Sequence, residues 1–287
     1  MNRRCIVCGS VGAAVAFRKN GYGVWRCSHC GFKYADAPAD NDFVRNFYTD
    51  DFFEGGHDKF GYSDYAGSKE SLLRSFRRKI SLIEKWIRRG RVLDVGCASG
   101  YFLECLGPGW DPYGCEPSRS MAEIARQRFG DRISVGEFDR YQSEHSFDLI
   151  TMWDTLDHFV DPRSAVEKVR SLLGRHGFLA INLGDCGSMV ARLLGMRWYH
   201  FIPPAHLSFF DRTTLSMFLK KNGFTVRETA YLGKYVDLAE IVLNLSFILR
   251  SDRLRKRAER LSKASFWNRY IYLNLFDDMT VLAQKAD

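Results

Sequence analysis

The sequence has no apolar stretch long enough to cross a lipid bilayer. Its longest apolar run, IVLNLSFIL at 241–249, is far shorter than a membrane-spanning helix, which needs about 20 residues. Residues 1–15 contain no apolar core followed by a small-residue cleavage site, so no secretory signal is expected. We therefore expect a cytoplasmic protein. Its eight cysteines are then reduced thiols, which makes them candidate metal ligands rather than disulfide partners.

Internal repeats and low-complexity segments are also absent, which excludes a solenoid or a disordered tail. With 287 residues, 46% of them hydrophobic and 26% charged, the chain can bury a full core as one large domain or a large and a small one. The net charge of +8 favours anionic partners such as phosphorylated small molecules, nucleic acid or a membrane surface.

Four cysteines form two pairs near the N-terminus, Cys5 with Cys8 and Cys27 with Cys30. Two thiolates separated by two residues can bind one tetrahedral zinc ion, and two such pairs complete its shell with no open position. The spacing therefore predicts a structural zinc ribbon over 1–35, because a domain of this size cannot build its own core. Residues 14–26, with Asn-Gly at the centre, predict a hairpin between the pairs.

The next segment, 36–89, connects the ribbon to the rest of the chain. Its first part, 36–66, is rich in aromatic residues without clear periodicity, and it forms either a lid over a cofactor or packing against the ribbon. Apolar residues then recur every three or four positions from Leu72 to Ile87, which predicts an amphipathic helix. Lys79 is among the cations that we assign to the outer faces of this helix.

Strands and helices alternate from residue 90 onward. The predicted strands are 91–95, 112–116, 133–135, 147–153 and 178–182, and the predicted helices are 100–106, 118–129 and 163–173. This alternation predicts right-handed βαβ units and a parallel sheet with helices on both faces. Ligands bind such sheets at the carboxyl ends of the strands. The chain closes with 223–231, a helical segment at about 235–263, and a last strand within 270–285.

The turn after the first of these strands reads RVLDVGCASGYF at 91–102. It departs from the dinucleotide fingerprint, because Ala98 replaces the second glycine and Gly100 comes one residue early. The turn resembles instead that of class I S-adenosylmethionine-dependent methyltransferases, in which the middle glycine is often another small residue. Glu116, FDLITMWDTLDHFVDP (147–162) and HGFLAINL (176–183) follow in the order typical of that family.

The resemblance implies a Rossmann-like α/β fold with a seven-stranded, mostly parallel sheet and helices on both faces. It places the methyltransferase domain at 90–287, with a helical insertion at about 235–263. Glu116 would accept both ribose hydroxyls of S-adenosylmethionine. The full set of expected cofactor contacts is Asp94, Gly96, Cys97, Ala98, Gly100, Glu116, Pro117 and Trp153.

With its cysteine ribbon, the chain is similar to bacterial zinc-ribbon methyltransferases of sugar, polysaccharide and natural-product pathways. This predicts O-methylation of a sugar, nucleotide sugar, glycan or related small molecule. A hydroxyl acceptor must lose a proton, so a base near neutrality helps. The candidate catalytic residues are His158 and His206, which follow the fourth and fifth strands, together with Asp154.

Two departures bear on the acceptor. Some sugar C-methyltransferases carry Tyr-x-Glu-His where this chain has Pro203, Pro204, Ala205 and His206, so C-methylation is only an alternative. In ubiquinone-type O-methyltransferases the fourth motif contains Glu-His and can contact a metal. Here Asp157 and His158 occupy these positions, so a second metal beside the structural zinc is an alternative rather than the expectation.

An RNA methyltransferase with a zinc-ribbon RNA-binding module is the second alternative. No Asn-Pro-Pro-Tyr tetrad follows the fourth strand, so a nucleic-acid partner is not expected. Residues 250–263 contain seven Lys or Arg against two acids. They form either a solvated helix end or a roof over the acceptor site that attracts an anionic acceptor. Segment 235–263 is also the candidate for a peripheral membrane contact.

Overall fold

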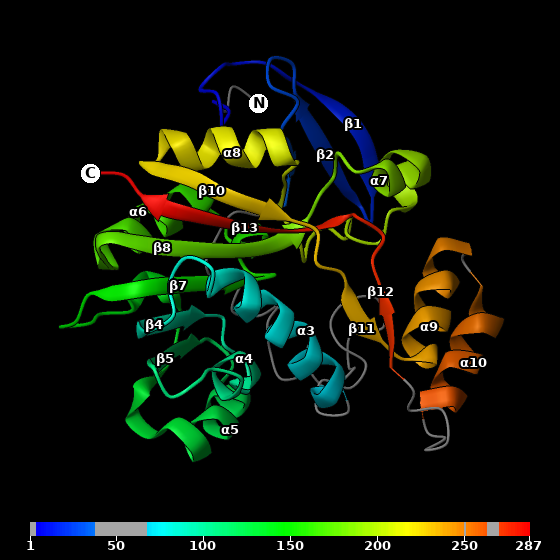
Figure 1. Cartoon of the computed structure of the whole chain (residues 1–287). Coiled ribbons are helices and arrows are strands. Elements are labelled where there is room, and N and C mark those ends of the chain that lie inside the picture. The colour runs from blue at the N-terminus through cyan, green and yellow to red at the C-terminus, as the bar shows by residue number, and fades with distance from the viewer. Residues whose placement is uncertain (1–3, 38–67, 250, 263–269) are drawn as a thin grey trace.

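The computed structural model describes residues 4–37, 68–249, 251–262 and 270–287. A seven-stranded sheet forms its centre, with the strand order β10-β13-β8-β7-β4-β5-β6 (Figure 1). Its strands are β4 (Gly90–Val95), β5 (Trp110–Glu116), β6 (Ile133–Val135), β7 (Phe147–Trp153), β8 (Leu173–Gly184), β10 (Phe224–Ala230) and β13 (Asp278–Lys285). All run parallel except β13, which is antiparallel to both of its neighbours. The predicted α/β fold with a mostly parallel seven-stranded sheet is confirmed.

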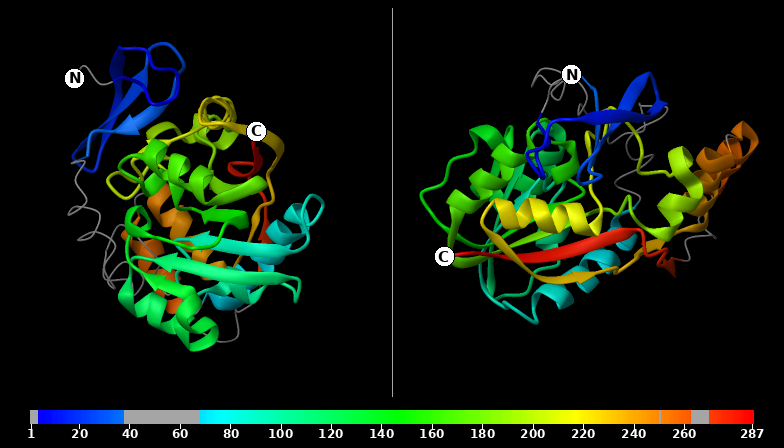
Figure 2. Two further views of the ribbon diagram at one scale, coloured as in Figure 1. Left: turned by 90° about the vertical axis from the view of Figure 1, so that its left-hand side faces the viewer. Right: turned by 90° about the horizontal axis from the view of Figure 1, so that it is seen from above.

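Helices cover both faces of this sheet, as the prediction required (Figure 2). They are α3 (Lys69–Ile83), α4 (Tyr101–Glu104), α5 (Arg119–Phe129), α6 (Pro162–Leu172) and α8 (Arg212–Lys221). The short helix α7 (Met189–Leu194) packs instead in a separate core with the N-terminal strands. One core joins α3, α4 and α5 to one face, and a second core joins α6 and α8 to the other. Short 3₁₀ turns are η1 (Gly130–Arg132), η2 (Phe138–Arg140), η3 (Leu156–His158) and η4 (Gly195–Arg197).

The N-terminal hairpin consists of β1 (Ala13–Lys19) and β2 (Tyr22–Cys27), and β3 (Lys33–Ala35) pairs with β2. Asn20 and Gly21 both have positive φ, 53° and 86°, as the predicted Asn-Gly turn requires. A fourth strand, β9 (Ser208–Phe209), completes this sheet from a distant part of the chain. The ribbon also shares a core with the main sheet, since Cys5, Val7, Cys27 and Phe32 belong to the cluster that contains Phe210.

The segment predicted as helical at 235–263 contains two helices, α9 (Leu238–Leu249) and α10 (Asp252–Ser262). They are flanked by β11 (Lys234–Val236) and β12 (Ile271–Leu273), which pair antiparallel in a separate ladder. Figure 1 shows α9 and α10 beyond the carboxyl ends of the parallel strands. No helix among the described residues is both long and apolar enough to cross a membrane.

Local sequence accounts for most helix starts. The Ser118 side chain accepts from the backbone amide of Met121 and caps α5, while Asp161 caps α6 ahead of Pro162. Asp211 and Thr214 form a capping box at the start of α8. One helix prediction was wrong in detail: Lys79, assigned to an outer face of α3, is buried at 7% exposure. The aromatic segment 36–66 lies almost wholly outside the described residues.

Candidate active site

The turn after β4 is built from backbone that favours glycine. Gly96, Ala98 and Gly100 have φ values of 75°, 44° and 80°, so three of these five residues take a left-handed backbone conformation. A Cβ on Gly96 would lie 2.9 Å from Thr155 Oγ1, which leaves no room for a side chain there. The turn therefore brings bare backbone to the carboxyl edge of the sheet, where a ligand can approach closely.

Glu116, at the end of β5, lies beneath this turn. Its Oε2 accepts from the amide of Ala98 at 2.8 Å, and its Oε1 accepts from the amide of Ser118 at 2.8 Å. The side chain is 3% exposed, and burial raises its pKa to about 7 despite these two bonds. Each carboxylate oxygen keeps a second lone pair, so the group can still accept from two ligand hydroxyls.

Two buried polar atoms near the turn, Ser99 Oγ and Trp153 Nε1, have no hydrogen-bond partner among the described residues. Buried polar groups are normally paired, so these atoms indicate that a ligand completes the site. Asp94 accepts from Thr151 Oγ1 at 2.6 Å, and burial raises its pKa to about 8. The turn, the carboxylate of Glu116 and these orphaned atoms together fit an adenosyl ligand with a ribose diol.

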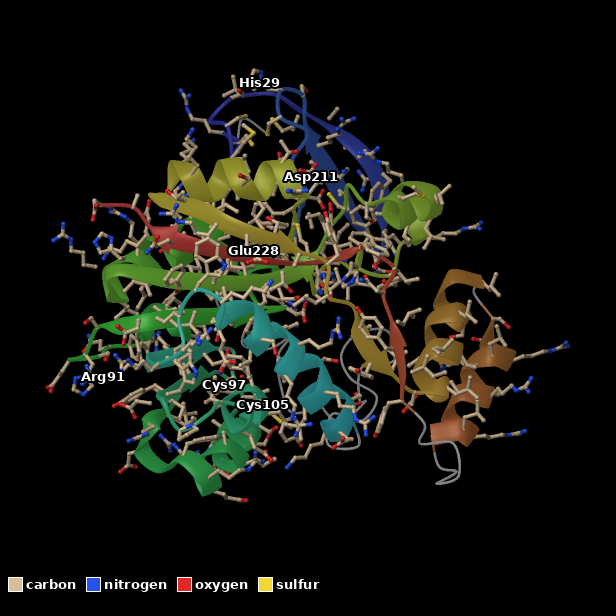
Figure 3. All side chains as sticks on the ribbon, viewed as in Figure 1. His29, Arg91, Cys97, Cys105, Asp211 and Glu228 are labelled. Atoms are coloured by element: carbon tan, nitrogen blue, oxygen red, sulfur yellow. The ribbon has the colours of Figure 1, made fainter. Side chains whose placement is uncertain are left out.

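Two of the expected cofactor contacts, Cys97 and Pro117, do not point a side chain from the buried edge toward a ligand. The Cys97 thiol points into the sheet, since a Cβ on Gly114 would lie 2.6 Å from Cys97 Sγ. Cys97 can therefore offer only its backbone to a ligand. Pro117 is exposed at the start of α5. Figure 3 shows Cys97 and Cys105 near α3 and α4, on the opposite side of the molecule from His29 of the ribbon.

Lys79 is a buried cation that the sequence analysis placed on an outer face of its helix, and it lies beside Trp153. Its ammonium lies 5.0 Å from the ring centroid of Trp153 and 5.4 Å from that of Phe76. A signal was present in the spacing, because Lys79 is three residues after Phe76 and four before Ile83, both of which are buried. Residues at those separations share a helix face.

Asp157, His158 and His206, which we call the acid–histidine cluster, meet where β7 ends. His206 Nδ1 lies 3.1 Å from Asp157 Oδ2, and His158 Nε2 lies 3.8 Å from Asp157 Oδ1. Within the described part of the chain, Asp157 Oδ1 and His206 Nδ1 are buried and have no hydrogen-bond partner. Burial lowers the pKa of His158 to about 4 and that of His206 well below its usual value, and it raises the pKa of Asp157 well above its own. The structure thus brings His158 and His206 together, with Asp157 between them.

Asp154 lies beside this cluster, at the end of β7, with a φ of 50°. Asn182 donates to Asp154 at 3.0 Å and to Asp278 at 2.8 Å, and it accepts from Thr280 at 2.8 Å. Asn182 and Asp278 were not predicted as site residues, because their meeting depends on β13 pairing with β8. The network holds Asp154 at the carboxyl edge between the cofactor turn and the acid–histidine cluster.

The four ribbon cysteines come together as their spacing predicted. Their sulfur atoms all lie within 4.8 Å of one another, with Cys5 to Cys30 at 3.6 Å and Cys8 to Cys27 at 3.7 Å. A tetrahedral thiolate shell with metal–sulfur bonds of about 2.3 Å has sulfur–sulfur edges of about 3.8 Å. The cluster thus fits a four-coordinate metal ion with no open position.

Residues 67–229 match the model of a family described as a methyltransferase domain. The chain belongs to this methyltransferase family. The methyltransferase is 27% identical over 179 residues to the ubiquinone biosynthesis O-methyltransferase of Vibrio cholerae, which covers 53% of this chain and 72% of the relative. It is also 23% identical over 168 residues to an uncharacterized protein of Methanocaldococcus jannaschii, with coverage of 58% and 80%.

A solved structure shares the fold of the methyltransferase over most of its length. It is the 1,6-didemethyltoxoflavin-N1-methyltransferase of Burkholderia thailandensis with its substrate and S-adenosylhomocysteine, at a TM-score of 0.52 and 15% identity. The match covers 96% of this chain and all of the other. The protein is an S-adenosylmethionine-dependent methyltransferase.

Proposed function

We propose that this methyltransferase methylates a hydroxyl oxygen of a sugar, nucleotide sugar or glycan, with His206 as the base. The observation that best supports this proposal is the buried pair of His206 Nδ1 and Asp157 Oδ2, which lie 3.1 Å apart at the end of β7. The name of the Vibrio cholerae relative, an O-methyltransferase, supports oxygen as the accepting atom. Carbohydrate as the acceptor class rests on the resemblance to zinc-ribbon methyltransferases.

S-adenosylmethionine supplies an electrophilic methyl group, so the chain must align the acceptor hydroxyl and remove its proton. A lowered pKa keeps His206 neutral at physiological pH, so it is free to accept that proton. Its Nδ1 faces Asp157 Oδ2 at 3.1 Å, so we assign the other ring nitrogen, Nε2, as the atom that accepts the proton. Asp157, whose pKa burial raises well above its usual value, holds the ring in position through this contact.

The cofactor contacts follow from the turn geometry. We assign the ribose diol to Glu116 and the close backbone approach to residues 96–100. Ser99 Oγ and Trp153 Nε1 are also assigned to the cofactor, because both atoms are buried and have no hydrogen-bond partner among the described residues. Asp154 is assigned to the boundary between cofactor and acceptor, since Asn182 holds it there.

The charge of α10 supports an anionic acceptor. Arg253, Lys256, Arg257 and Arg260 are exposed on this helix, which lies beyond the carboxyl edge of the sheet (Figure 1). Cations at this place attract a phosphate, as on a nucleotide sugar or a lipid-linked glycan. For a lipid-linked acceptor, α9 and α10 would also contact the membrane surface, in keeping with the expected cytoplasmic location.

The ribbon cysteines are proposed to bind one structural zinc ion. The sulfur–sulfur distances of 3.6 and 3.7 Å match a tetrahedral four-thiolate shell, which zinc prefers. With four thiolates no position remains for water or acceptor, so the ion stabilises the ribbon and takes no part in methyl transfer. One zinc per chain by metal analysis is the expected result, and a metal-free protein that stays folded would contradict it.

The function is tested by supplying labelled S-adenosylmethionine together with separate acceptor fractions: sugars, nucleotide sugars, lipid-linked glycans and RNA. We expect label in a carbohydrate fraction, released as an O-methyl group on product analysis. Label that enters RNA alone, or a carbon-bound methyl in the sugar, would overturn the proposal. The His206→Gln variant serves as the control for transfer by contaminating enzymes.

A further inference from the structure

The segment that carries His206 is held between the ribbon and the main sheet. The amide of Leu207, the next residue, donates to the carbonyl of Asp157 at 2.8 Å. Its own carbonyl accepts from the amide of Ala35, in the ribbon, at 2.9 Å. The residue next to His206, Leu207, is therefore held from both sides, by the backbone of Asp157 on one and by the ribbon on the other.

The tip of the ribbon hairpin holds the same segment earlier along the chain. Asn20 Nδ2 donates to the carbonyl of Pro203 at 2.9 Å, and Lys19 Nζ donates to that of Trp198 at 3.3 Å. The rings of Phe17 and Phe201 meet edge to face at 5.0 Å. The turn residue Asn20 thus has two roles, since it takes the left-handed conformation and also donates to the segment.

Strand pairing adds a third connection. Lys33 pairs with Phe209 and Tyr34 with Ser208, so β9 extends the ribbon sheet directly after His206. The rings of Phe32 and Phe210 lie 4.8 Å apart in the core that also contains Cys5 and Cys27. The cysteine cluster sets the path of the chain from β2 to β3, so its geometry reaches the His206 segment through these contacts.

We propose that the ribbon forms one wall of the acceptor site and that Asn20 is a positioning residue for His206. The proposal rests on the proposed role of His206 in methyl transfer. A ribbon that served only as a separate recognition module would not need contacts with the main domain. Here the hairpin tip bonds to Pro203 and β3 pairs with β9. Asn20 acts through the backbone of Pro203 and so sets the distance between His206 and Asp157.

The test compares Asn20→Asp and Asn20→Gly with a ribbon control, His29→Ala. Aspartate keeps the shape and tolerates positive φ but replaces the donating amide with an oxygen that repels the Pro203 carbonyl. Glycine keeps the turn and removes the donor. His29 is exposed and lies on the outer side of the ribbon (Figure 3). Zinc content, S-adenosylhomocysteine affinity, the ¹⁵N signals of the His206 ring, and acceptor kcat and KM are measured for each.

We expect both Asn20 variants to shift the His206 ring signals and to lower kcat at least about tenfold, as misplacement of a catalytic group does. Zinc content and S-adenosylhomocysteine affinity should match those of His29→Ala. Unchanged His206 signals in both variants would overturn the positioning role, and so would an affinity loss as large as the kcat loss. Shifted signals in a protein that methylates no hydroxyl would uphold the positioning role and refute the proposed function instead.

Discussion

Two parts of the carboxyl edge of the sheet are assembled in different ways. The cofactor part, from Asp94 to Ser118, comes from one strand–turn–helix unit and the strand beside it. The acceptor part joins η3, the segment that carries His206, and a hairpin tip near the N-terminus. Glu116 binds backbone 18 residues away, whereas Asn20 binds backbone 183 residues away. The first part depends on local turns and the second on docking between distant elements.

Because of this difference, substitutions in the two parts should impair different steps, cofactor binding in one and methyl transfer in the other. A change in the cofactor part should alter cofactor affinity while the acid–histidine cluster keeps its shape. A change in the acceptor part should reduce methyl transfer while the cofactor still binds. We therefore expect that the two parts can be altered independently.

The largest effect is expected at His206. Replacement by Gln keeps much of the ring volume but removes the base, so kcat should fall about 10²- to 10⁴-fold, as for loss of a general base. S-adenosylhomocysteine affinity by calorimetry should stay within about twofold, since Glu116 and the turn are untouched. A variant that loses cofactor affinity as well would show that the two parts are coupled.

Glu116→Ala tests the cofactor part. The change removes two charge-assisted hydrogen bonds to the ribose and should weaken S-adenosylhomocysteine binding by about 3 kcal/mol, a factor of about 100. Calorimetry measures this loss directly. Glu123→Ala, on the exposed face of α5, is the matched control and should bind normally. Equal affinity in the two variants would remove Glu116 from the cofactor site.

The raised pKa of Glu116, about 7 in the free protein, predicts pH-dependent cofactor binding. Ribose hydroxyls donate to the carboxylate form, so below pH 7 the protein must release a proton when it binds. Affinity should therefore rise with pH up to about 7, by at most tenfold per pH unit. Calorimetry in two buffers of different ionisation enthalpy measures the proton release. In Glu116→Gln this part of the dependence should vanish, whereas a wild-type affinity that is flat from pH 5.5 to 7 would contradict the prediction.

The smallest effect is expected from α10. Neutralising Arg253, Arg255 and Arg257 together should raise the acceptor KM about threefold at low salt. Arg253 and Arg257 are exposed and Arg255 is half-buried, so they attract an anion only weakly and salt screens them. Cofactor affinity should not change. The control removes three exposed arginines elsewhere, Arg119→Ala, Arg140→Ala and Arg175→Ala in one chain. If both triple variants behave alike at every ionic strength, α10 is a solvated surface.

The cofactor part was predictable because its signals are local. Strands 133–135 and 147–153 were predicted to the residue, and the positive φ values at Gly96 and Gly100 follow from the glycines themselves. The cysteine spacing likewise predicted the sulfur cluster, which the structure assembles. The charge of Lys79 led us to assign it to an outer face, although its spacing from Phe76 and Ile83 marks a buried face.

The acceptor part could be predicted only residue by residue. The sequence indicated His158 and His206 separately, but Asp157 between them and the contact of Asn20 with Pro203 require the folded chain. Docking of β3 on β9 leaves no trace in either short strand, because two residues of β9 carry no periodicity. Contacts between elements far apart in the chain, such as β3 with β9, therefore could not be predicted from the sequence.

The pairing of β3 with β9 also sets an order of events during synthesis. The ribbon emerges from the ribosome about 175 residues before its partner strand, which at about 5–20 residues per second is a delay of roughly 10–35 seconds. Through that interval the edge of β3 has no β9 to pair with, and an unpaired strand edge invites association with other chains. Early metal capture would hold the nascent hairpin in shape while the rest of the chain is made. Limited metal supply would then reduce the yield of folded protein before it affected turnover of finished enzyme.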